Sequence, residues 1–268
     1  MKNLLYKIAY LLVLIGTNTL QAQSVMVSPS IVRFNAAPGK TETKTISVIN
    51  NTKKTLELKL YLQDWLRDSI GKHLYYKQDT LSRSCASIVS INPESYIKID
   101  SGQIGKILVR LQYPATASNN EMKWAMLFLE SISEAKDPSK LKKMSMRVGT
   151  AIRVGVHIYQ TPPGAITKAV SNVRLLADSA QKGFVYLYMK NTGQVRLDCK
   201  AHLELTYLST GEENILKAVT FPVFPDGFRR VRLDLPKDLK PGNYSFLAVL
   251  DYGIDVPLEA VQQNITIY

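Results

Sequence analysis

Cysteine and histidine are scarce in this chain of 268 residues, which contains two Cys and three His. His73, His157 and His202 lack the i, i+2 or i, i+4 spacing that aims two imidazoles at one metal, and no Cys lies beside them. Two cysteines are also too few for the disulfide framework of a small secreted domain. We expect no metal and no cofactor. We also expect Cys85 and Cys199 to be unpaired, with Cys199 a buried residue of an apolar strand.

Sequence motifs of catalysis are missing as well. The chain contains no G-x-S-x-G run, as a nucleophile elbow would require, and no Gly-rich phosphate loop. A pair of carboxylates for glycoside hydrolysis would need only a spatial separation, and no feature of the sequence points to one. The prediction is a protein with no catalytic residues that is not an enzyme.

Acidic residues are outnumbered, since 34 Lys and Arg face 22 Asp and Glu and the formal net charge is +12. Most of these cations are scattered along the chain, which argues against a nucleic-acid partner. Two groups are denser, and they admit two interpretations. They are either a solvated loop and an outward strand face, or a surface that attracts an acidic partner or an anionic envelope. The groups are Lys136, Lys140, Lys142 and Lys143, and Arg229, Arg230 and Arg232.

Long hydrophobic runs are absent apart from a short one near the start. Lys2 and Lys7 accompany an apolar stretch of about nine residues at 8–16, and Leu20-Gln21-Ala22 follows with short side chains. This order is typical of a secretory signal, and the run is well below the roughly 20 residues of a membrane-spanning helix. We predict a signal peptide over 1–22, cleaved before Gln23. No Cys follows the apolar stretch, so a lipoprotein is not expected. We expect an exported or periplasmic protein without stable membrane insertion.

Alternation of apolar and polar residues with period two recurs through the rest of the chain, and helical spacing is nearly absent. The pattern predicts strands at 45–49 and 56–62, joined by an Asn-rich turn at 50–52. It predicts two more strands at 96–99 and 107–111. From Trp124 to Leu129 both alternating sets are apolar, which indicates a strand buried on both faces.

An unusually long strand is predicted from Met144 to Tyr159. A strand of this length exceeds the usual five or six residues, so its leading half should extend past the sheet that houses the trailing half. The alternating set on one face consists of Met144, Met146, Val148, Thr150, Ile152, Val154, Val156 and Ile158.

The strand pattern stops at residues 161–164, where two prolines interrupt pairing. Further strands are predicted at 184–191, 197–207, 215–221, 231–235, 244–251 and 258–268. The turn before Tyr244 resembles the tyrosine corner of immunoglobulin-like sandwiches. The predicted fold class is therefore all-β, with two immunoglobulin-like sandwiches in tandem at 23–161 and 165–268. A single closed barrel is the alternative.

Four segments together resemble the first domain of periplasmic pilus-assembly chaperones. They are residues 27–34, the strand that ends at Asn50-Asn51-Thr52, residues 97–111, and the run 124–128 before a basic loop. The resemblance covers roughly residues 25–163. The second half resembles only a generic immunoglobulin or fibronectin-like sandwich. The resemblance implies a two-domain, boomerang-shaped, non-enzymatic protein, a divergent member of that family. Its long strand would lend alternating side chains to an exported protein subunit by β-strand addition.

The resemblance also implies the residues that bind the partner. They are Met144, Met146, Val148, Thr150 and Ile152 of the loaned face, together with Arg153. The alternative is that these side chains pack the first domain's own core. In the family an Arg on the first strand and a Lys late in the long strand anchor the subunit's terminal carboxylate. The matching positions hold Ile31 and either Val156 or His157, so Arg33 and Arg153 are the candidate anchors. The rival function is an envelope or cell-surface scaffold or adhesin that binds an envelope component.

Overall fold

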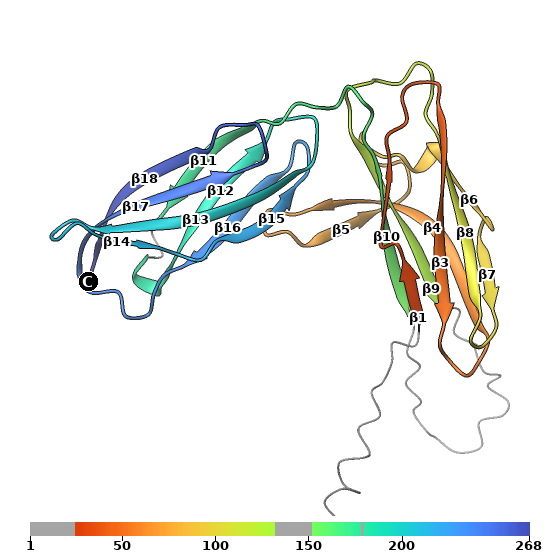
Figure 1. Cartoon of the computed structure of the whole chain (residues 1–268), viewed down its shortest axis with the longest axis horizontal. Coiled ribbons are helices and arrows are strands. Elements are labelled where there is room, and N and C mark those ends of the chain that lie inside the picture. The colour runs from red at the N-terminus through yellow and green to blue at the C-terminus, as the bar shows by residue number, and fades with distance from the viewer. Residues whose placement is uncertain (1–24, 132–151, 178–179) are drawn as a thin grey trace, which may run out of the picture.

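The computed structural model of the chain describes residues 25–131, 152–177 and 180–268. These residues form an all-β protein, in which the only helical segments of the described ranges are the short 3-10 turns η1 (Ala86–Ile88) and η3 (Ala180–Lys182). The strands before residue 161 and the strands after residue 169 form separate pairs of sheets, which lie side by side in Figure 1. This confirms the predicted fold class of two sandwiches in tandem. The exact limits of the two domains stay a prediction.

The first sandwich consists of a four-stranded sheet in the order β1-β3-β8-β6 and a six-stranded sheet in the order β2-β10-β9-β4-β5, with β7 also paired to β4. All of its pairs are antiparallel except β2 with β10, which run parallel. The strands are β1 (Val25–Ser28), β2 (Ile31–Phe34), β3 (Thr41–Asn50), β4 (Leu56–Arg67), β5 (His73–Tyr76), β6 (Val89–Asn92), β7 (Tyr96–Ile99), β8 (Ile104–Gln112), β9 (Lys123–Ser131) and β10 (Arg153–Gln160).

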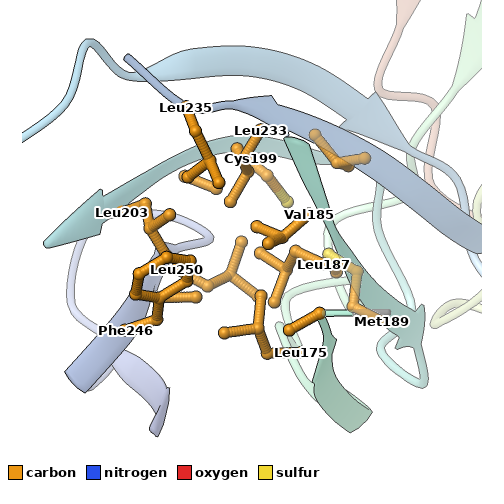
Figure 2. Packing of buried hydrophobic residues seen from close by; sticks show 14 of the residues in the cluster. Leu175, Val185, Leu187, Met189, Cys199, Leu203, Leu233, Leu235, Phe246 and Leu250 are labelled. Atoms are coloured by element: carbon orange, nitrogen blue, oxygen red, sulfur yellow. The ribbon is translucent and has the colours of Figure 1, made fainter. Parts of the chain in front are cut away.

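The second sandwich consists of a three-stranded sheet in the order β11-β12-β16 and a five-stranded sheet in the order β14-β13-β17-β18, with β15 also paired to β13. Side chains from both sheets, among them Leu187, Cys199 and Leu250, meet between them in Figure 2. The strands are β11 (Val170–Leu176), β12 (Phe184–Asn191), β13 (Leu197–Tyr207), β14 (Glu212–Ile215), β15 (Val219–Val223), β16 (Phe228–Asp234), β17 (Gly242–Asp251) and β18 (Glu259–Ile267).

Each sandwich uses a fully buried asparagine to lead the chain from one sheet to the other. Asn50 at the end of β3 donates from Nδ2 to the carbonyls of Lys54 (2.8 Å) and Ile99 (2.9 Å). Asn191 at the end of β12 donates in the same way to Val195 (2.9 Å) and Val223 (3.0 Å). The predicted Asn-rich turn is therefore a connection between opposite sheets, since β3 and β4 do not pair with each other. A buried amide is suited to this position because it satisfies backbone groups that leave the ladder.

The structure tests two predictions about the second half of the chain, the tyrosine corner and the strand at 215–221. The Tyr244 hydroxyl donates to the Lys240 carbonyl at 3.0 Å, which confirms the tyrosine corner. The prediction of a single strand at 215–221 is wrong. The chain there forms the end of β14 and the start of β15, which pair with opposite ends of β13. Period-two alternation continues across such a break, because it reports the face of each residue and does not report its partner.

Residues 1–24 lie outside the described residues, so cleavage between Ala22 and Gln23 stays a prediction. In the described part of the chain, no helix is long and apolar enough to cross a membrane.

Candidate partner-binding strand and interdomain face

Strand β10 has an open edge over its first half. Across its eight residues it pairs with β9, whereas β2 pairs only with His157–Gln160. In the described part of the chain, Arg153–Val156 thus have a strand neighbour on one side only. The His157 N–H donates to the Ser30 carbonyl at 3.0 Å, so the odd-numbered residues point their backbone groups toward that edge. Such an edge can accept a strand from another chain.

The residues predicted to bind a partner fall partly outside the described residues. Met144, Met146, Val148 and Thr150 all lie within 132–151, where the structure is not described. Ile152 is half-buried, and its N–H donates to the Ser131 hydroxyl at 2.8 Å. Further along the same alternating set, Val156 and Ile158 are buried in the core of the first sandwich. The last residues of the predicted face therefore belong to the core of the first sandwich. The role of the face before Ile152 stays a prediction.

The two candidate anchors lie far apart. Arg33 pairs in register with Tyr159, six positions from Arg153 along β10, and a strand rises about 3.3 Å per residue, so roughly 20 Å separates the two sites. The Arg153 guanidinium lies 3.7 Å from the centroid of the Phe128 ring and donates to Gln63 Oε1 at 2.8 Å. Arg33 lines a hollow with Tyr159 and Arg196. The two arginines therefore lie beside opposite ends of β10.

The outer face of the six-stranded sheet carries a second apolar cluster. As predicted, β9 is buried on both faces, since Ala125, Leu127 and Leu129 enter the sandwich core while Trp124, Met126 and Phe128 lie on the opposite side. The outer cluster also contains Trp65 and Tyr159 of the first sandwich and Phe224 of the second. The rings of Trp65 and Phe224 are 4.9 Å apart in a T-shaped contact. This cluster, which we call the interdomain cluster, joins the two sandwiches by apolar burial.

A hairpin formed by β4 and β5 reinforces this junction. It reaches from the first sandwich toward the second (Figure 1), and the Ser69 carbonyl at its tip accepts the N–H of Arg230 at 2.8 Å. Next to it, Arg83 Nε donates to Asp226 Oδ2 at 2.8 Å. Backbone, ionic and apolar contacts thus all connect the two halves.

The structure brings together two histidines that sequence spacing left unconnected. His73 begins β5 and His157 lies on β10, and their Nε2 atoms are 3.4 Å apart. Both rings pack against Trp65, with centroid distances of 4.9 and 5.0 Å. The charged residues near the two histidines are Arg67 and Arg196, and both positive charges disfavour a protonated imidazole. Burial, the adjacent His73 and Arg67 lower the pKa of His157 to about 4, and burial and Arg67 lower the pKa of His73.

Acidification is therefore expected to destabilise the folded protein. In the unfolded chain a histidine titrates near its ordinary pKa of about 6.5, so below that pH the unfolded state binds protons that the folded state excludes. Stability should be fully present above about pH 6.5 and should fall as the pH approaches about 4. Because solvent reaches part of the His157 ring, we expect a loss of about 1–2 kcal/mol.

Urea denaturation as a function of pH measures this loss. His157→Gln should flatten the pH dependence. His202→Gln is the matched control, because His202 lies in the second sandwich, where it forms a hydrogen bond with Glu204. This variant should keep the pH dependence of the wild type. Equal curves for wild type and His157→Gln would contradict the assignment.

Within the described residues, no three His, Cys, Asp or Glu side chains gather where they could hold a metal ion. Both cysteines are buried free thiols, Cys85 in the first core and Cys199 in the second. Burial raises the pKa of both thiols, that of Cys199 to about 12, so neither forms a thiolate nucleophile at neutral pH.

Among family models, curated proteins and solved structures, only solved structures match the chain. No family model and no curated protein matches the chain. Among solved structures, a chain from a chaperone–tip adhesin complex of CFA/I fimbriae biogenesis matches with a TM-score of 0.50, at 12% identity, over 90% of this chain and 98% of that one. The described chain therefore shares its fold with that chain. This confirms, at the level of the fold, the resemblance that the sequence suggested.

Two further solved structures match with lower TM-scores. The class 5 fimbriae chaperone CfaA has 14% identity and a TM-score of 0.48, over 90% of this chain and 98% of that one. A CsuC–CsuE chaperone–tip adhesion subunit complex of Acinetobacter baumannii has 14% identity and a TM-score of 0.45, over 78% of this chain and 90% of that one.

Proposed function

We propose that this protein is an exported, non-enzymatic chaperone-like protein that binds an exported protein subunit by β-strand addition along β10. The observation that carries the proposal is the open edge at Arg153–Val156, which leads directly toward the alternating apolar residues before it. In strand addition, main-chain hydrogen bonds supply affinity, and alternate side chains fill the groove of the partner. The fimbrial chaperone fold and the predicted signal peptide support the proposal.

Co-expression with exported subunits encoded beside its gene tests this function. A one-to-one complex purified from the periplasm is the expected result. If the protein instead stays with the envelope fraction or with a polysaccharide and captures no subunit, the rival function of an envelope scaffold or adhesin replaces the proposal.

The apolar residues before β10 supply a second test. We expect Met146→Asp combined with Val148→Asp to abolish capture of the subunit, because charged side chains cannot fill an apolar groove. The change should cost less than about 1 kcal/mol of stability if these side chains are exposed in the free protein. Size-exclusion chromatography of the complex and urea denaturation of the free variant give the two readouts. Unfolding of the variant would assign these residues to the first core.

A further inference from the structure

A cavity of about 360 Å³ lies between the two sandwiches, beside the hairpin tip. One wall is formed by Leu66 and Arg67 at the end of β4 and by Trp124 of β9, and the other by Phe224 and Arg229 around the turn from β15 to β16. No residue of β2 or β10 lines it, so it is separate from the proposed partner-binding strand.

The charge around this cavity is unbalanced. Three arginines line it, namely Arg67, Arg83 and Arg229, and Asp226 is the one acidic residue among its described lining residues. Asp226 is already bound to Arg83 at 2.8 Å. Arg67 and Arg229 form no salt bridge with any described residue. Among those residues, Arg67 donates only to the Gly71 carbonyl at 2.7 Å, and Arg229 donates only to the Ser69 carbonyl at 3.4 Å, both at the hairpin tip.

This arrangement is costly without an anion. The Nε atoms of Arg67 and Arg229 are buried without a hydrogen-bond partner among the described residues. Burial lowers the pKa of both guanidinium groups, and the proximity of Arg67 lowers the pKa of Arg229 further, against a smaller opposing effect of Asp68 at the hairpin tip. Two partly desolvated cations that repel each other are stabilised when an anion binds both of them, because charge-assisted hydrogen bonds are roughly twice as strong as neutral ones.

Most of the remaining surface of the cavity is apolar, with Ser69 and Ser82 as the polar exceptions. Trp124 and Phe224 belong to the interdomain cluster, and Leu66, Leu81 and Val223 complete the apolar wall. The Asp64 carboxylate fixes the loop that carries Leu81, since it accepts the N–H groups of Thr80 and Leu81 at 2.8 Å. A small inorganic anion would leave this wall uncovered, whereas a volume of this size, near the lower end of about 300–1,000 Å³ for ligand pockets, holds an anion with an apolar group attached.

We propose that this cavity binds an amphiphilic organic anion, whose carboxylate or phosphate contacts Arg67 and Arg229 and whose aliphatic or aromatic group packs against Trp124 and Phe224. Such a ligand touches both sandwiches at once. Its binding therefore fixes their relative position and raises the melting temperature of the whole chain, because a ligand that binds only the folded state stabilises that state. This ligand site is independent of strand addition.

Four decyl compounds test the proposal on the full chain, each below its micelle concentration. Decanoate and decyl phosphate carry the anion, decanol carries no charge, and decyltrimethylammonium carries the opposite charge. Trp124 lines the cavity, so tryptophan fluorescence reports binding, and thermal unfolding reports the stabilisation. We expect both anions to bind at least about ten-fold more tightly than decanol, because decanol has no charge to pair with the two guanidinium groups. Equal affinity for decanoate and decanol, or no binding of either anion, would overturn the proposal.

Charge-removing variants locate the site. Arg67→Gln and Arg229→Gln should each weaken decanoate binding about ten-fold and leave decanol unaffected. The matched control is Arg232→Gln, because Arg232 lies three residues beyond Arg229 and stacks at 4.0 Å on Phe184, outside the cavity lining. An equal loss in Arg232→Gln would show general attraction to a basic surface and would refute the site. If one cavity variant fails to fold, the other variant and the comparison of decanoate with decanol still decide the question.

Discussion

Replacing Trp65 by Ala is expected to lower the free energy of unfolding by about 3–5 kcal/mol, the range for removing a large aromatic side chain from a core. Trp65 is fully buried, and its ring contacts His73, His157 and Tyr159 of the first sandwich as well as Phe224 of the second. The cavity left by Ala removes apolar contacts within the first sandwich and across the interdomain junction at the same time. Urea denaturation followed by circular dichroism measures the loss.

Trp65→Phe is the matched control for this change. A phenyl ring keeps most of the apolar contact, and it removes the indole Nε1–H, which is buried without a hydrogen-bond partner among the described residues. We therefore expect Trp65→Phe to cost less than half as much as Trp65→Ala. Similar losses in the two variants would show that ring contacts do not carry the junction. A loss below about 1 kcal/mol in Trp65→Ala would show that the cluster contributes little to folding.

Replacing Arg153 by Pro is expected to weaken binding of an exported subunit about five-fold or more, while Arg153→Ala keeps most of the affinity. Residue 153 shares the backbone direction of His157, so its N–H points to the open edge of β10 and away from β9. Proline removes that donor, and one missing backbone hydrogen bond costs about 1 kcal/mol. Alanine removes the guanidinium that covers Phe128 and retains the donor.

The comparison of the two variants thus separates the main chain from the side chain. Titration of the purified subunit, followed by calorimetry, gives both affinities, and urea denaturation checks that the two variants remain folded. Proline is tolerated at strand edges that face away from the ladder, so we expect both variants to fold. Equal affinities for Arg153→Pro and Arg153→Ala would mean that the subunit does not pair with this edge, and strand addition at Arg153 would be excluded.

The interdomain junction changes how one of the two dense groups of cations is interpreted. The sequence suggested that Arg229, Arg230 and Arg232 lie on an outward strand face or attract an acidic partner. In the structure, Arg232 and Arg230 stack on Phe184 and Tyr186, whereas Arg229 lines the cavity between the sandwiches. Neighbouring cations of one strand therefore serve different purposes, because successive side chains alternate between its faces. The lysine group at 136–143 lies outside the described residues.

Much of the fold was determined by the sequence alone. The period-two pattern identified the strands at 184–191 and 197–207 with the bounds that β12 and β13 have. It also identified the double burial of β9 and the turn before Tyr244. These properties depend on which face each residue occupies and on local turn chemistry, so a single stretch of sequence contains the necessary information. The sequence also placed the proline break between the two sets of strands.

The tertiary structure alone decided which of these faces meet. His73 and His157 are 84 residues apart along the chain, and the hairpin contact of Arg229 with Ser69 spans 160 residues. No local pattern encodes such pairs, because a strand has the same alternation whether it lies at an edge or in the middle of a sheet. The register with β2 and β9 leaves the first half of β10 unpaired on one side among the described residues. The arginine-lined cavity forms where Phe224 and Arg229 of the second sandwich meet Arg67 and Trp124 of the first. Both candidate sites thus arise from pairing and docking between distant segments, whose partners are selected by burial and backbone hydrogen bonding in the folded chain.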